Sequence, residues 1–86
     1  MFYVYLLESS NHRYIGATHD LKKRVKEHNA GKNTSTKPYL PWKVVYYEAH
    51  TELENAKRRE RYFKTNPGRQ ALSKMLRTYY SNKNTS

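Results

Sequence analysis

The chain has 86 residues, no cysteine and a formal net charge of +10, because 17 lysines and arginines face seven aspartates and glutamates. This length fits one domain with a modest core, and the missing thiols exclude disulfides, thiolate catalysis and cysteine-based zinc sites. Such an excess of positive charge predicts a polyanionic partner, above all nucleic acid. No apolar run approaches the ~20 residues of a membrane-spanning helix, and no secretory signal is recognisable. We therefore expect a cytoplasmic protein without a membrane partner.

The first residues predict a β-hairpin. Residues 2–7 (Phe-Tyr-Val-Tyr-Leu-Leu) are an apolar and aromatic run typical of a strand. Residues 8–13 are polar and rich in turn formers, and residues 14–17 (Tyr-Ile-Gly-Ala) predict a second short strand. This hairpin would deliver Tyr5 and Tyr14 beside the helix that follows.

That helix is predicted over residues 20–29. Asp20 is suited to its N-cap and Gly31 to its C-terminal end. His28 falls on the apolar face, with Arg24 one turn before it. Taken alone, a histidine there is usually a core-edge residue, and an arginine within a lysine run usually belongs to a solvated basic face.

Residues 32–41 predict a loop, because lysine, serine, threonine, asparagine and proline dominate them. The ordinary interpretation is a solvated connection, and the alternative is a flexible basic contact to phosphates. Residues 42–49 (Trp-Lys-Val-Val-Tyr-Tyr-Glu-Ala) predict a third strand, since β-branched and aromatic residues dominate.

A second helix is predicted over residues 51–65, opened by the capping-box pattern Thr-Glu-Leu-Glu. Its apolar positions are Leu53, Ala56 and Phe63. Glu60 falls on the same face, and burying a carboxylate is costly unless it is paired or binds a metal. The residues alone leave two interpretations, a buried salt bridge to Arg24 or another base, and a metal ligand.

A third helix is predicted from Asn66 as N-cap and Pro67 as first residue. Its expected core positions are Leu72, Met75, Leu76 and Tyr79. Residues 81–86 predict a frayed polar tail. The sequence therefore predicts one α+β domain over residues 1–80, in the order β-β-α-β-α-α, with a small, mainly antiparallel three-stranded sheet flanked by three helices.

Three separated motifs resemble the GIY-YIG nuclease family. Its two strand motifs correspond to Tyr3-Val4-Tyr5, with Tyr-Val in place of Gly-Ile, and to Tyr14-Ile15-Gly16. Arg24 and His28 match the family's helical arginine and histidine, and Glu60 in Ala-Lys-Arg-Arg-Glu matches its later glutamate. The resemblance spans nearly the whole chain. It is strongest to small stand-alone members, which are similar to the N-terminal nuclease domain of the excision-repair endonuclease.

The resemblance implies a divalent-metal-dependent endonuclease that hydrolyses phosphodiester bonds in DNA, with nicking, structure-selective cleavage and DNA repair or processing as suggested roles. It makes Glu60 the ligand of one Mg²⁺ or Mn²⁺ ion and Arg24 a phosphate-binding side chain. Tyr5 and Tyr14 share the roles of general base and positioning group, with Tyr14 slightly favoured as base. His28 would shuttle a proton or contact the phosphate.

Exposed cations near these residues are expected to bind nucleic acid. They are Lys22, Lys23, Lys32, Lys37, Arg58 and Arg61. The same charge would serve the alternative function, a non-catalytic nucleic-acid-binding module on a nuclease-derived fold. Such a module has no need of Glu60 on a core-facing position, which favours the enzyme. We expect DNA as partner, with RNA open, and weak sequence preference supplemented by self-association or a partner protein.

Overall fold

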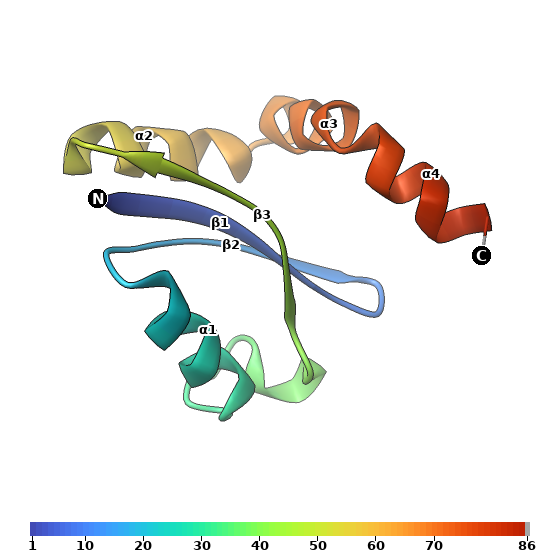
Figure 1. Ribbon diagram of the computed structural model, residues 1–86, viewed down its shortest axis with the longest axis horizontal. Helices are drawn as coiled ribbons and strands as arrows, with labels where there is room; N and C mark the ends of the chain where they lie inside the picture. The colour runs from blue at the N-terminus through green and yellow to red at the C-terminus, as the bar shows by residue number, and fades with distance from the viewer. Residues whose placement is uncertain (86) are drawn as a thin grey trace.

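Three antiparallel strands run through the middle of the molecule (Figure 1). The computed structural model describes residues 1–85. β1 (Phe2–Ser9) is the central strand, with β2 (His12–Thr18) on one side and β3 (Lys43–His50) on the other. The predicted α+β fold with a three-stranded antiparallel sheet is confirmed.

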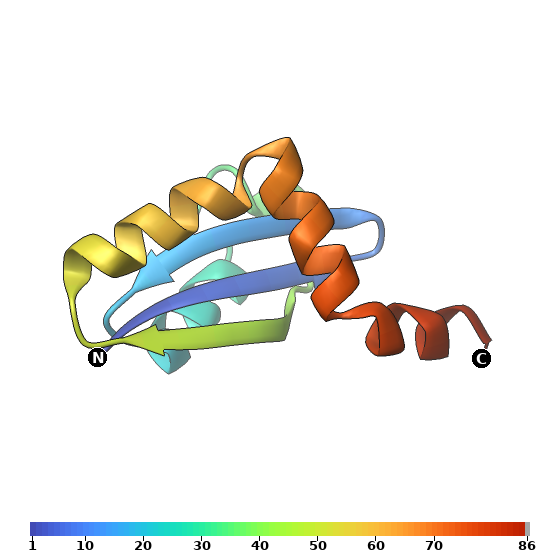
Figure 2. The same cartoon turned by 90° about the horizontal axis from the view of Figure 1, so that it is seen from above.

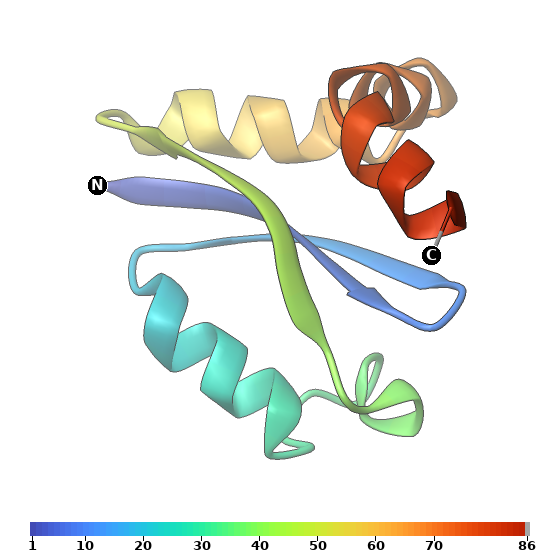
Figure 3. The same ribbon diagram turned by 45° about the vertical axis from the view of Figure 1, so that its right-hand side comes forward.

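Helices cover both faces of the sheet. α1 (Leu21–Asn29) lies against one face, and α2 (Leu53–Phe63) runs along the other, as Figures 1 and 3 both show. α3 (Asn66–Met75) follows α2, and α4 (Arg77–Thr85) leads to the C-terminus (Figure 2). A short 3-10 helix, η1 (Lys37–Tyr39), precedes β3. Across residues 1–85, no helix combines the length and apolar character needed to cross a membrane.

Both faces of β1 are buried, which explains its continuous apolar sequence. Val4 packs with Ala56, Phe63 and Leu72 beneath α2 and α3. Successive side chains point to opposite faces, so Tyr5 and Leu7 lie in a second cluster with Trp42, against which Leu21 and Val25 of α1 pack. The sheet therefore separates two small cores, and α1 belongs to the one that contains Tyr5.

The first two strands extend further than predicted. The ladder continues through the pairs Glu8–Arg13 and Ser9–His12, so only residues 10 and 11 remain as the turn. Polar residues can occupy these strand positions because the ladder is held by backbone hydrogen bonds, which do not depend on side-chain polarity.

The predicted caps of α1 are confirmed, and the predicted cap of α2 is wrong. Asp20 caps α1 as predicted, accepting a hydrogen bond from the amide of Lys23 at 3.1 Å. Gly31 follows α1 with φ +75°, the conformation for which glycine is preferred. The predicted capping box of α2 is wrong, because the helix begins at Leu53 and Glu52 is its N-cap, without a side-chain cap hydrogen bond.

The N-cap of α3 is Thr65, not Asn66 as predicted. Its hydroxyl accepts a hydrogen bond from the amide of Gly68 at 3.2 Å. The same hydroxyl lies 2.6 Å from the carbonyl oxygen of Tyr62, to which it donates. Thr65 therefore joins the end of α2 to the start of α3, a double role that Asn66, one residue later, does not take.

Two predicted core positions lie at the surface. Leu53 is 42% exposed and Met75 is 47% exposed. Leu53 is the first residue of α2 and Met75 the last of α3, so each stands where the helix starts or ends. Leu72 is buried and Leu76 packs against the core, as predicted.

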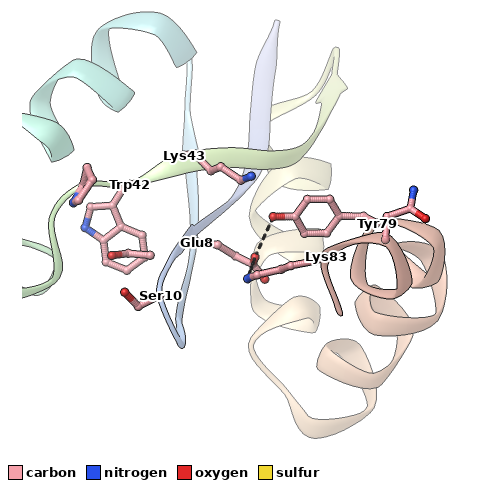
Figure 4. A pocket seen from close by; sticks show the side chains of 9 residues that line it. Glu8, Ser10, Trp42, Lys43, Tyr79 and Lys83 are labelled. Atoms are coloured by element: carbon pink, nitrogen blue, oxygen red, sulfur yellow. Dashed lines mark hydrogen bonds and ion pairs between the residues drawn. The ribbon is translucent and has the colours of Figure 1, made fainter. Parts of the chain in front are cut away.

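The predicted frayed tail is wrong, because residues 81–85 are part of a fourth helix; residue 86 lies outside the described residues. The helix docks through Glu8, a buried residue of β1. The hydroxyl of Tyr79 donates to the Glu8 carboxylate at 3.2 Å, that of Tyr80 donates to it too, and Lys83 Nζ lies at 3.3 Å. Figure 4 shows Tyr79 and Lys83 directed toward Glu8. These bonds hold the helix on the sheet.

Candidate active site

The ring of Tyr5 lies across Gly16 of the neighbouring strand. The register of β1 and β2 places these residues directly opposite each other, so both face α1. A Cβ atom at position 16 would stand 2.5 Å from Cζ of Tyr5, closer than any van der Waals contact. The glycine is therefore required for the close approach of the phenol. The sequence motif alone does not show why a glycine is needed at this position.

His28 of α1 holds the Tyr5 hydroxyl from the other side. Its Nε2 lies 2.9 Å from the Tyr5 oxygen, and its Nδ1 lies 2.8 Å from Oγ1 of Thr36. Burial, with the nearby positive charge of Arg24, lowers the pKa of His28 below its usual 6.5. The imidazole is therefore neutral at neutral pH, and both of its ring nitrogens are hydrogen-bonded.

The environment of Tyr5 keeps its phenol protonated. Burial, followed by repulsion from Tyr14, raises the pKa of Tyr5 to about 12. Arg24 acts in the opposite direction, and the charge of Glu60 adds to the increase. At neutral pH Tyr5 is thus a neutral hydrogen-bonding group.

Tyr14 and Arg24 complete the cluster. The ring of Tyr14 lies 4.9 Å from that of His28 and 6.3 Å from that of Tyr5, measured between centroids, and it is half-buried. Arg24 Nη1 pairs with Glu27 Oε1 at 3.1 Å, and its guanidinium interacts with Tyr5. The structure therefore brings together four of the predicted site residues, and Tyr14 and Arg24 are the two that solvent reaches.

Glu60 lies on α2, across the sheet from α1 (Figure 3). Its side chain is 24% exposed, and its carboxylate pairs with Lys64 Nζ at 3.2 Å, one helical turn on, rather than with Arg24. The predicted salt bridge is therefore made to another base, Lys64, and is partly exposed; Arg24 as its partner is wrong, because the two helices cover opposite faces (Figure 3). The charge of Glu60 still contributes to the raised pKa of Tyr5, so the carboxylate is close enough to influence the cluster.

The donor set suits only a sparsely coordinated metal ion. Within the described part of the chain, no three histidine, aspartate, glutamate or cysteine side chains gather closely enough to hold a metal ion. One accessible carboxylate, Glu60, fits Mg²⁺, which keeps most of its water ligands and binds through one or two carboxylates. The same set does not fit zinc, which takes three or four protein ligands.

The predicted nucleic-acid-binding cations divide between the two faces. Lys22 and Lys23 are exposed on α1, and Lys32 and Lys37 are exposed beyond its C-terminus. The remaining two, Arg58 and Arg61, are exposed on α2. The cations therefore form two basic surfaces.

Part of the loop 32–41 supports the site, which the sequence did not predict. Thr36, which bonds His28, is only 1% exposed, and its carbonyl oxygen accepts a hydrogen bond from Trp42 Nε1 at 2.8 Å. Asn29 binds the backbone of Trp42 at both its N–H and its carbonyl, at 2.7 and 3.0 Å. A fully solvated loop is therefore wrong. A single threonine in a polar segment carries no sequence signal for burial.

Comparisons with known proteins identify the family to which the chain belongs. The family model of the GIY-YIG catalytic domain matches residues 1–73. A UPF0213 protein of Streptococcus agalactiae serotype V is 42% identical over 64 residues, covering 72% of this chain and 73% of the relative. A UPF0213 protein of Streptococcus pyogenes serotype M5 is 37% identical over 83 residues, covering 94% and 90%. No solved structure matches significantly. The chain belongs to the GIY-YIG catalytic domain family, alongside the small UPF0213 proteins.

Proposed function

We propose that the protein is a divalent-metal-dependent endonuclease that hydrolyses phosphodiester bonds in DNA. One observation carries the proposal: the cluster of Tyr5, Tyr14, Arg24 and His28 on the α1 face of the sheet. Membership of a nuclease family supports the reaction class. The metal, the substrate and the role of each residue are parts of the proposal.

Tyr14 is the proposed general base. A base must be reached by the attacking water and must be able to give up its own proton beforehand. Tyr5 satisfies neither condition, since it is buried and its pKa is raised to about 12. Tyr14 is half-buried, so water can reach it, and its ring lies beside that of His28 in the same cluster. Tyr5 then serves to position the site.

Arg24 is the proposed phosphate-binding group. Its guanidinium is partly exposed, and its contact with Glu27 employs only one of its nitrogens, Nη1. The N–H donors that are engaged neither with Glu27 nor with Tyr5 suit phosphate oxygens. A lysine at this position would keep the charge but lose this planar arrangement.

His28 is proposed as a positioning residue and not as a group that touches the substrate. It is fully buried, and its two nitrogens bind Tyr5 and Thr36. A neutral histidine in this place fixes the direction of the Tyr5 hydroxyl, and through it the packing around Tyr14.

Glu60 is the proposed metal ligand. A bound Mg²⁺ or Mn²⁺ ion would act as a Lewis acid toward the departing oxygen. The Oε2 atom of Glu60 pairs with Lys64 Nζ. This exposed pair is weak enough for a metal ion to take the place of the lysine.

Plasmid nicking tests the function. Supercoiled DNA would be incubated with the protein in Mg²⁺ or in EDTA, beside Glu60→Gln and Arg24→Ala. We expect nicking only with Mg²⁺ and loss of activity in both variants. Glu54→Gln is the matched control, since Glu54 is an exposed glutamate on the same helix and should be dispensable. Cleavage in EDTA, or full activity of Glu60→Gln, would contradict the proposal.

The alternative is a nucleic-acid-binding module without catalysis. The observation that favours it is the Glu60–Lys64 pair, which is an ordinary salt bridge between residues one turn apart and needs no metal. This function predicts salt-sensitive DNA binding, no nicking under any condition, and unchanged binding by Glu60→Gln.

A further inference from the structure

A groove runs between α1 and β3 on the sheet face that carries the tyrosine cluster. Its volume is about 830 Å³, and β1, β3 and α1 contribute its lining. The part of this sheet face near the edge strand β3 is not covered by α1. Tyr47 of β3 is consequently 55% exposed and Val44 is 37% exposed.

The floor of this groove is aromatic. Tyr47 lies opposite Tyr5 in the ladder and therefore faces the α1 side of the sheet. Its ring meets that of Tyr3 edge-on, with centroids 6.1 Å apart and an angle of 61° between the planes. An accessible pair of rings offers flat surface to a planar ligand.

The rim of the groove is basic. Lys22, Lys26 and His19 line it and are exposed. Among the described lining residues, the one carboxylate is that of Asp20, and it caps α1 through the amide of Lys23. Two lysines against one aspartate leave the rim with an excess of positive charge.

Aromatic rings beside cations suit single-stranded nucleic acid, whose bases stack on the rings while its phosphates meet the cations. A double helix keeps its bases stacked on one another and offers phosphates alone. An acidic peptide would use the rim and leave the floor uncovered. A second copy of the chain would bring the same positive rim against this one.

We propose that the groove binds an unpaired strand of nucleic acid beside the catalytic cluster. The proposal deepens the nuclease function and rests on it for the identity of the polymer. Lys22 and Lys26 lie one turn apart on one side of α1, and Arg24 lies on the other side. A substrate in which a single strand adjoins a duplex would therefore occupy both sides of this helix, and the protein selects such junctions.

The test measures binding without cleavage. Fluorescence anisotropy in EDTA would compare a fluorescein-labelled oligothymidylate with a blunt duplex of the same length. We expect Tyr47→Ala to raise the Kd for the single strand about tenfold and the Kd for the duplex by less than about twofold. Tyr47→Trp keeps a stacking surface and should retain single-strand affinity, which separates stacking from damage to the fold.

Tyr62→Ala is the matched control, because Tyr62 is a comparably exposed tyrosine on α2, across the sheet from the groove. Equal effects of Tyr47→Ala on both ligands, or equal effects of the two alanine variants, would overturn the proposal. So would a fall in molecular mass on Tyr47→Ala in sedimentation, because a second copy would then occupy the groove. If the protein does not nick plasmid DNA but Tyr47→Ala selectively loses affinity for the single strand, only the nuclease function is contradicted.

Discussion

The contact between Tyr5 and Gly16 shows how one missing side chain organises the site. Gly16 leaves room for the hydroxyl end of the Tyr5 ring beside β2, and this hydroxyl lies 2.9 Å from His28 Nε2. His28 in turn reaches Thr36 in the loop. This series of buried hydrogen bonds, from Tyr5 through His28 to Thr36, therefore depends on a close approach that only glycine permits.

Gly16→Ala tests this dependence. The added methyl group would collide with the Tyr5 ring, so we expect the free energy of unfolding to fall by about 1–3 kcal/mol and nicking activity to fall with it. Urea denaturation followed by circular dichroism measures the change. Ala49→Ser, at an exposed position of β3, should change stability by less than about 0.5 kcal/mol. Unaltered stability of Gly16→Ala would show that β2 can move away from Tyr5 at no cost.

At the scale of elements, α4 is held to the sheet chiefly by polar groups. Burial tends to raise the pKa of Glu8, but hydrogen bonds from Tyr80, Lys83 and Tyr79 outweigh it, and the pKa of Glu8 is lowered from 4.5. The unfolded chain therefore binds the proton more readily than the folded one. The stabilisation is fully present above pH 4.5 and is lost as the pH falls through the lower, folded-state pKa.

Glu8→Gln should loosen this helix. Removing the charge weakens several hydrogen bonds at a buried acceptor, which costs about 1–3 kcal/mol. We expect faster amide hydrogen exchange in α4, unchanged exchange in α2, and a shallower loss of stability below pH 4.5 than in the unsubstituted protein. Glu52→Gln, at an exposed position, serves as control. Equal protection of α4 in both variants would mean that Glu8 does not hold it.

The elements that the sequence predicted correctly have local signals. Asp20 and Gly31 mark the ends of α1, and the aromatic run of β1 identifies a buried strand. Docking of α4 has no such signal, because Tyr79 binds a carboxylate 71 residues away. The site likewise contains residues that the sequence predicted and one that it did not. The motifs placed Tyr5, Tyr14, Arg24 and His28 together, whereas the burial of Thr36 follows from tertiary packing that no spacing encodes.

At the scale of the whole molecule, the exposed cations include two groups on opposite sides of the sheet, one on and after α1 and one on α2. On the proposed function, a straight duplex bound at the tyrosine cluster would contact the α1 face first. Lys22 and Lys23 should therefore contribute more to duplex affinity than cations on α4. Each phosphate contact releases counterions, so the contribution appears in the salt dependence of binding.

The double variant Lys22→Gln/Lys23→Gln should weaken duplex binding and reduce the slope of log Kd against log salt by nearly two, since each lysine accounts for about 0.9 of that slope. Titrations at several salt concentrations in EDTA measure it. Arg77→Gln/Lys74→Gln removes the same charge from exposed positions outside both basic surfaces and should alter the slope less. Equal reductions would indicate that charge, and not its location, governs binding.

The order of the elements along the chain has one more consequence. Tyr5, Tyr14, Arg24 and His28 all precede the loop 32–41, and Glu60 follows it, yet β3 from the second half pairs with β1 from the first. If the chain were divided after Thr36, Thr36 would stay in the same fragment as His28. Neither fragment would then contain the whole site. Reassembly through the β1–β3 ladder would restore it. On the proposed nuclease function, nicking by the two halves would then report that two proteins fused to them have met.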